Sequence, residues 1–193
     1  MNRLVTLAVL AVCTSTAQAA PDTYLIDSTH TYPQFTYTHL GYSSQTHGFD
    51  KTSGKVTLDR AAQTGSADVT IDATSVHTGS ALFNGIIQGA DYFDTARYPT
   101  ITFKSSKMTF DGKQPVSMAG DLTIKGVTKP ETLTITHFLC MPHPMLKVMA
   151  CGANATASIK RSDFNMGKGV PFVSDEITLS LAIEAIREQS PAQ

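Results

Sequence analysis

The sequence of 193 residues contains no tryptophan, few charged residues and only three cysteines. Its 15 Lys and Arg residues stand against 16 Asp and Glu residues, which gives a formal net charge of −1. A balance this close to zero excludes a basic protein that binds nucleic acid by neutralising phosphates. The charged content of 16% lies well below the usual ~25%, which also excludes a disordered acidic or basic tail protein.

The N-terminal apolar run, residues 4–12, is far shorter than the ~20 residues needed to cross a bilayer. It precedes Ala17-Gln18-Ala19, which fits the small-x-small site that signal peptidase reads. The sequence therefore predicts a cleaved signal peptide over residues 1–19 and an exported mature chain over residues 20–193.

Removal of the signal peptide takes one of the three cysteines away and leaves Cys140 and Cys151. A lipoprotein anchored through Cys13 is the less favoured alternative, because Val12 is a poor residue before a lipidated cysteine. An even pair in an oxidising compartment predicts one disulfide. Its short closed loop would contribute about 2–3 kcal/mol by the chain-entropy estimate. The alternative is two reduced cysteines that never meet.

Threonine is unusually frequent, with 26 residues, and β-branched side chains favour pleated sheet. Several segments alternate apolar and polar residues, which predicts strands with one buried face. The predicted strands cover residues 24–30, 34–40, 55–59, 66–72, 100–103, 116–124, 133–139 and 177–185. No linker or change of composition divides the mature chain. We therefore expect one all-β domain of roughly eight to ten strands, built as an antiparallel barrel or sandwich.

One stretch, residues 80–89, has helical rather than strand periodicity. Thr78 or Ser80 is available as its N-cap. The apolar residues that recur at helical spacing are Leu82, Phe83, Ile86 and Ile87. The sequence predicts one short helix that closes one end of a cavity or touches a membrane; a helix that only covers the core is the alternative.

No common catalytic or cofactor-binding motif is present. The sequence lacks the G-x-S-x-G elbow, the H-E-x-x-H zinc helix, the P-loop and the G-x-G-x-x-G dinucleotide turn. Ser, His and Asp occur, but a triad is defined by geometry and not by composition. The sequence therefore predicts no cofactor, and an enzyme is the third-ranked hypothesis.

Two histidines are expected inside the barrel. His39 shares its strand parity with Phe35 and Tyr37, and His137 shares the predicted face of Ile135. A histidine that points into an apolar cavity is a candidate contact for a ligand head group. The alternative is a hydrogen-bonded core histidine.

A basic group formed by Lys125, Lys129 and Arg161 is a further candidate contact. Such side chains bind anionic head groups through charge-assisted hydrogen bonds. The alternative is that they form a solvated face.

The segment between the two cysteines is rich in methionine. Its thioether and imidazole groups, which suit a soft cation such as Cu(I), belong to Met141, His143, Met145 and Met149. Methionine also lines adaptable apolar surfaces. The sequence therefore leaves two interpretations of this loop, a metal site and an apolar rim held by the disulfide.

Seven motifs follow one another in a fixed order over about residues 24–187. They are Tyr24-x-Ile26-Asp27-x-x-His30, Gly48-Phe49, Phe93-Asp94, Tyr98-Pro99-x-Ile101-Thr102-Phe103, Gly120-Asp121-Leu122-Thr123-Ile124-Lys125-Gly126-Val127-Thr128-Lys129-Pro130, Arg161-Ser162-Asp163-Phe164 and Val173-Ser174-Asp175-Glu176. In this order they resemble the YceI-like family of bacterial periplasmic proteins.

The resemblance implies a lipocalin-like antiparallel β-barrel of about eight strands with one short helix. It implies a periplasmic protein that binds or carries a polyisoprenoid or other long-chain amphiphilic lipid, without catalysis. The residues expected to line the pocket are Phe35, Tyr37, His39, Phe103, Leu122, Ile135, His137 and Leu179, below a cap of Leu82, Phe83, Ile86 and Ile87. A copper-binding module that uses loop 140–151 is the alternative function. The sequence leaves open a transient membrane contact and a homodimer.

Overall fold

Strands dominate residues 20–189, the part of the chain that the computed structural model describes. In chain order the elements are β1 (Asp22–Ile26), β2 (Gln34–His39), β3 (Ser43–Phe49), β4 (Thr52–Asp59), β5 (Thr64–Asp72), η1 (Ala73–Ser75), β6 (Val76–His77), α1 (Ala81–Ile87), β7 (Thr100–Asp111), β8 (Gln114–Ile124), β9 (Val127–Pro142), β10 (Met149–Lys160), η2 (Arg161–Phe164) and β11 (Glu176–Arg187). The predicted signal peptide, residues 1–19, lies outside the described residues, so its cleavage stays a prediction.

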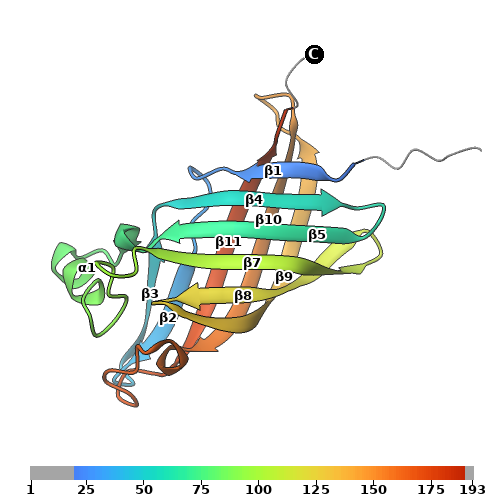
Figure 1. Cartoon of the computed structure of the whole chain (residues 1–193). Helices are drawn as coiled ribbons and strands as arrows, with labels where there is room; N and C mark the ends of the chain where they lie inside the picture. The colour runs from blue at the N-terminus through green and yellow to red at the C-terminus, as the bar shows by residue number, and fades with distance from the viewer. Residues whose placement is uncertain (1–19, 190–193) are drawn as a thin grey trace, which may run out of the picture.

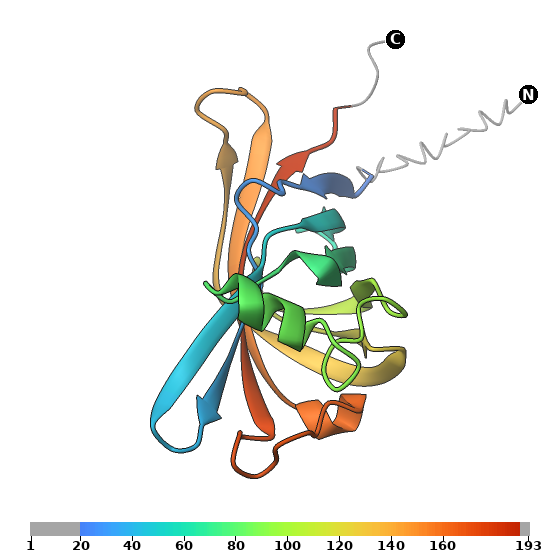
Figure 2. The same cartoon turned by 90° about the vertical axis from the view of Figure 1, so that its left-hand side faces the viewer.

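Eight of the strands form a closed antiparallel barrel (Figure 1). Their hydrogen-bonded order is β1-β4-β5-β7-β8-β9-β10-β11, and β11 returns to β1 through the pairs of residues 185–187. The same edge of β11 pairs with β2 through residues 178–180, so that β2, β3 and β6 extend the sheet beyond the barrel (Figure 2). The predicted all-β barrel of about eight strands with one short helix is confirmed.

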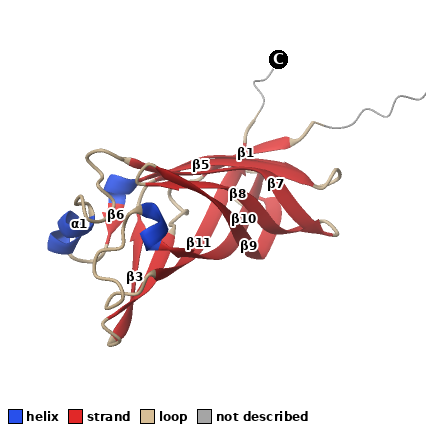
Figure 3. Cartoon of the chain, turned by 60° about the horizontal axis from the view of Figure 1, so that its bottom comes forward, coloured by secondary structure: helices blue, strands red, loops and turns tan. Residues whose placement is uncertain are grey.

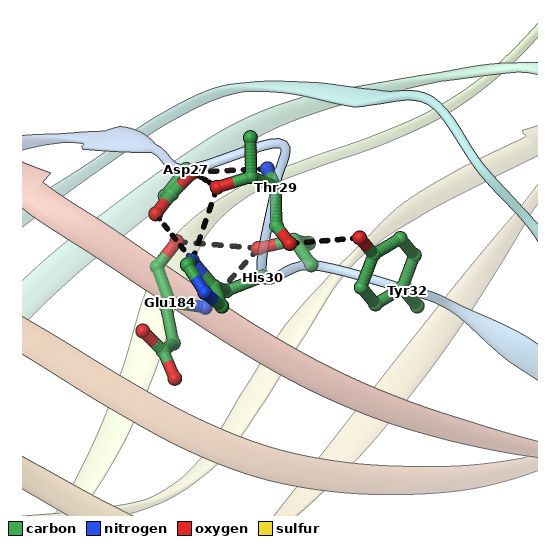
Figure 4. A network of polar contacts seen from close by, with 6 residues as sticks. Asp27, Thr29, His30, Tyr32 and Glu184 are labelled. Carbon is green, nitrogen blue, oxygen red and sulfur yellow. Dashed lines mark hydrogen bonds and ion pairs between the residues drawn. The ribbon is translucent and has the colours of Figure 1, made fainter.

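The turn between β1 and β2 holds the seam where β11 changes partners (Figure 4). His30 Nδ1 lies 2.8 Å from Asp27 Oδ2, and Thr29 Oγ1 donates to Asp27 Oδ1 at 2.6 Å. These hydrogen bonds hold the pKa of Asp27 at about 2. Next along the turn, the Thr31 hydroxyl donates to the carbonyl oxygen of Glu184 and accepts from its backbone N–H. The motif residues Asp27 and His30 thus shape the corner that closes the barrel.

The Gly120–Pro130 motif forms the hairpin of β8 and β9. Ile124 pairs with Val127, which leaves the two-residue loop Lys125-Gly126. Both loop residues have positive φ, 49° and 74°. A type I′ turn requires this conformation and matches the twist of the flanking strands. Gly126 is needed for a second reason, because a Cβ there would lie 2.6 Å from Cε1 of Tyr98.

A β-bulge in β9 reverses the face presented by the second half of this strand. His137 and Ile135 pair with consecutive residues of β10, so Thr136 is the extra residue. Before the bulge Leu133 is buried, whereas after it His137 is exposed and Phe138 packs inside. The prediction that His137 points into the barrel is wrong, because the period-two pattern was extended across an inserted residue.

Two apolar clusters fill the barrel. The larger lies near α1, and the smaller surrounds buried Tyr24, Leu58 and Ala185 at the opposite end. The predicted disulfide is confirmed: Cys140 and Cys151 are direct cross-strand partners in β9 and β10, and they pack against the smaller cluster. The disulfide therefore braces the end of the barrel that is filled by side chains.

The helix α1 covers the other end, where the helical segments gather (Figure 3). The Ser80 hydroxyl caps it by accepting from the backbone N–H of Phe83. Asn84 Oδ1 accepts from both the backbone N–H and the hydroxyl of Thr78. This pair of bonds anchors the helix to the preceding turn, although Asn84-Gly85 is a weak helix former. Within residues 20–189, no helix has both the length and the apolar character of a membrane span.

Candidate functional site

An apolar cavity of about 230 Å³ occupies the barrel interior between α1 and the smaller apolar cluster. Along β11, every second residue from Ile177 to Ile183 lines it. At about 3.3 Å per residue, the part of β11 that lines the cavity is about 20 Å long. The lining is aliphatic and aromatic over most of its area, so the cavity is suited to a long apolar chain.

Most of the pocket-lining predictions agree with the observed cavity wall. Six of the eight predicted residues line the cavity: Phe35, Tyr37, His39, Phe103, Leu122 and Leu179. Ile135 and His137 do not line it; Ile135 lies just before the bulge of β9, and His137 faces solvent beyond it. Contact of any of these residues with a ligand stays a prediction.

Two of the four residues predicted to cap the pocket lie at the cavity, and their contact with a ligand stays a prediction. Phe83 and Ile87 line the cavity, and Ile87 is fully packed. Leu82 and Ile86 lie on the outer side of α1, where they are 79% and 49% exposed. A seven-residue helix presents one stripe to the barrel, so its remaining apolar side chains face outward.

Under α1, the buried His47 lies next to the half-buried Tyr37, which lines the cavity. The Tyr37 hydroxyl and His47 Nε2 are 3.1 Å apart, and the His47 ring packs edge-on against Phe35 and Phe83. Burial raises the pKa of Tyr37 and lowers the pKa of His47, which nearby His77 lowers further. Sequence reasoning missed His47 because β3 lacks apolar alternation.

The depressed pKa of His47 makes stability depend on pH. In the unfolded chain this imidazole has a pKa near 6.5. As pH falls below that value, His47 is protonated in the unfolded chain but stays neutral in the folded protein. The free energy of unfolding therefore decreases. We expect His47→Gln to reduce the loss of stability between about pH 6.5 and 5, because the glutamine amide can hydrogen-bond to Tyr37 but does not titrate. Urea unfolding at several pH values measures this.

The matched control is His137→Gln, because His137 is exposed on the outer face of β9. Its pH dependence should equal that of the unsubstituted protein. A parallel fall in stability for the His47 variant and the unsubstituted protein would contradict the assignment to His47.

Arg161 is buried at the start of η2, where it is 6% exposed. Its guanidinium donates to the carbonyl oxygens of Ser174 at 2.8 Å and of Lys168 and Val173 at 2.9 Å, as well as to that of Met166. These bonds fold the loop between η2 and β11 around one side chain. Arg161 also lines the cavity, but backbone carbonyls take up four of the five N–H donors of its guanidinium, so this geometry favours a structural role over the candidate anion contact.

Lys125 has a similar structural role in the β8–β9 turn. Its Nζ donates to the carbonyl oxygens of Ala90 at 2.7 Å and Asn165 at 2.8 Å. These bonds join the loop after α1 to the loop after η2. Two of the three basic residues considered for a head group therefore hold loops together at the α1 end.

The loop between the cysteines does not gather the ligand atoms expected for copper. Met149 packs with the smaller cluster, whereas Met141 is exposed on the opposite face of the β9–β10 ladder. His143 Nδ1 accepts from the backbone N–H groups of Met145 and Leu146, both at 3.2 Å. The Met145 side chain is 81% exposed. Of the two alternatives, an exposed apolar rim fits this arrangement better than a metal site.

Among residues 20–189, one group of three side chains has the spacing of metal ligands. These are Asp27, His30 and Glu184, whose ligand atoms lie within 4.8 Å of one another. Both carboxylate oxygens of Asp27 and Nδ1 of His30 already take part in the hydrogen bonds of the seam. We therefore assign this group to closure of the barrel.

Comparison of sequences identifies relatives over most of the chain. Residues 24–185 match the model of the YceI-like domain. The protein YceI of Escherichia coli O157:H7 is 33% identical over 178 residues, which cover 91% of this chain and 92% of that protein. The likeness thus spans nearly the full length of both proteins.

Solved structures with the same fold include BcnA of Burkholderia cenocepacia, with a TM-score of 0.68 and 28% identity over 83% of this chain and 99% of that chain. A polyisoprenoid binding domain from Saccharophagus degradans, implicated in plant cell wall breakdown, has a TM-score of 0.62. It is 19% identical and covers 86% of this chain and 98% of that chain. At this identity, the second likeness concerns the fold alone.

Proposed function

The chain belongs to the YceI-like family, and from this premise we propose that it buries a polyisoprenoid, or another long-chain amphiphilic lipid, in its barrel cavity. The observation that carries the proposal is the long apolar cavity, whose wall is built from alternate residues of the barrel strands. Each buried methylene contributes about 0.8 kcal/mol, so affinity grows with chain length and needs few polar contacts.

The proposed role is that of an exported carrier without catalysis. The signal sequence predicted over residues 1–19 supports export, and the Cys140–Cys151 disulfide is typical of an oxidising compartment such as the periplasm. The polyisoprenoid binding domain that shares the fold supports the ligand class. Contact with a membrane is part of the proposal, because the lipid has to be collected from one.

Native mass spectrometry of the protein purified from the periplasm tests the proposal. We expect a species heavier than the mature chain, whose excess mass is extracted into organic solvent as one lipid class. The same protein, unfolded in urea and refolded without lipid, is the control and should show the mass of the mature chain alone. A lipid-free mass in the gently purified sample, with nothing in the extract, would contradict the proposal.

A further inference from the structure

The cavity lining reaches the surface at the end of the barrel that carries α1 and η2, and we call this exposed part of the lining the cavity opening. His39, the last residue of β2, lines the cavity and is also exposed. It forms an isolated bridge with Val173, which lines the cavity from the loop after η2. The opposite end of the barrel is filled by the cluster around Tyr24 and Leu58. The exposed part of the cavity lining therefore lies beside the β2–β3 hairpin and the loop after η2, at the end that side chains do not fill.

Exposed apolar side chains project beside this opening. They are Leu40 (49% exposed), Tyr42 (87%), Val170 (39%) and Phe172 (72%), which we call the tip patch. Two backbone hydrogen bonds join the segments that carry them: Leu40 N–H donates to the carbonyl oxygen of Phe172 at 2.7 Å, and Ser174 N–H donates to that of Thr38 at 2.9 Å. Figures 1 and 2 place both segments at the same end of the barrel. The tip patch is thus held in place by the fold.

The segments that carry the tip patch contain no charged residue. Residues 31–49 and 169–174 include no Asp, Glu, Lys or Arg. At the overall charged content of 16%, the 19 residues of the first segment alone would carry about three charges (0.16 × 19). Lys168, which precedes the second segment, is paired with Asp91. Charged groups oppose entry into a bilayer, so their absence favours contact with lipid.

We propose that the tip patch docks on the surface of a lipid bilayer and places the cavity opening against it. With about 150–250 Å² for an aromatic side chain, the exposed area of the patch is on the order of 500 Å². A stable protein interface needs about 800 Å² from each partner. An uncharged patch also lacks the electrostatic complementarity that orients protein partners. Tyr42 and Phe172, in contrast, suit the interface between head groups and acyl chains.

The inference rests on the proposed function, because a lipid has to leave a bilayer to enter the cavity. It names the surface through which that exchange takes place. The outer side of α1 carries Leu82 and Ile86 at the same end of the barrel.

Co-sedimentation with phosphatidylcholine vesicles tests the inference. The variant is Tyr42→Ser/Phe172→Ser, whose changes are exposed and spare the cavity wall. The matched control is Met145→Ser/Leu146→Ser, which removes two exposed apolar side chains (81% and 56%) from the β9–β10 hairpin at the opposite end. We expect the tip variant to bind at least about tenfold more weakly than the unsubstituted protein. The control variant should bind as the unsubstituted protein does.

Equal binding by the tip variant and the unsubstituted protein would overturn the inference. The same holds if no protein binds, or if binding requires added phosphatidylglycerol and disappears in high salt. A second measurement uses the absence of tryptophan from the chain. The fluorescence of Phe172→Trp should shift to shorter wavelength on vesicles, whereas that of Met145→Trp should not.

Native mass spectrometry separates this inference from the proposed function. After loading from detergent solution, the tip variant should retain as much lipid as the unsubstituted protein, because its cavity is unchanged. Loss of retained lipid in the tip variant would contradict a role limited to docking. If the unsubstituted protein binds vesicles through the tip patch but carries no lipid, the proposed function fails and the docking surface holds.

Discussion

Replacing Leu179 with Trp is expected to reduce the lipid retained by the protein about tenfold or more. Leu179 lies on β11 opposite Phe35 of β2 and lines the cavity. The larger indole would occupy space that the ligand chain needs. Displacing two methylenes removes about 1.6 kcal/mol, and about 1.4 kcal/mol corresponds to a tenfold change in affinity.

The empty protein should tolerate this substitution, because the added ring fills existing space. We expect its free energy of unfolding to stay within about 1 kcal/mol of the original value. The matched control is Leu139→Trp, since Leu139 is 51% exposed on the outer face of β9. Native mass spectrometry after loading measures lipid, and urea unfolding measures stability. The cavity would not be the binding site if both variants retained equal amounts of lipid.

Strand segments with a strict period of two could be predicted from the sequence, together with the direction of their side chains. In β11, Ile177, Leu179, Leu181 and Ile183 line the cavity and Ala185 is buried, as their alternation indicates. In β7, Ile101 and Phe103 share the cavity wall for the same reason. Once one face of a strand is buried, parity alone places each side chain.

Some strands could not be predicted because their composition is not typical of strands. The segment of β10 is rich in Ala, which has a weak strand preference. Its residues Ala153, Ala155 and Ala157 pair with Ile183, Leu181 and Leu179 and share their face of the sheet. None of these alanines lines the cavity, to which β10 contributes Ile159.

The cavity opening could not be predicted, because it depends on contacts between distant segments. Nothing local to His39 indicates that it meets Val173, and both positions are defined by loops rather than by periodicity. The same is true of Arg161, whose donors reach carbonyl groups up to 13 residues away. A hydrogen-bonded loop of this kind has no repeat in the sequence.

Replacing Arg161 with Met is expected to lower the free energy of unfolding by about 3–5 kcal/mol. The guanidinium satisfies carbonyl groups of Met166, Lys168, Val173 and Ser174 from a buried position. Met fills a similar volume but donates nothing, so carbonyl groups in the loop lose their partners. Each buried group left unpaired costs about 1–3 kcal/mol, and part of the cost is recovered where water reaches the loop.

Arg161→Lys and Lys160→Met separate the causes of this loss. Lysine keeps the positive charge but lacks the planar fork, so we expect an intermediate loss for Arg161→Lys. Lys160 is the exposed neighbour, and Lys160→Met should change stability by less than about 0.5 kcal/mol. Urea unfolding measures all three variants. An Arg161→Met protein as stable as the Lys160→Met protein would show that the loop does not depend on the guanidinium.

The Arg161→Lys protein, which we expect to fold, also tests whether Arg161 holds the loop beside the cavity opening. Val170 and Phe172 lie within the loop that the guanidinium holds, and Val173 lines the cavity. If the loop loosens, amide hydrogen exchange over residues 166–174 should accelerate before the barrel strands are affected. The same variant should bind vesicles more weakly, because the loop carries two residues of the tip patch. Slow exchange in this loop, equal to that of the unsubstituted protein, would limit Arg161 to a role in global stability.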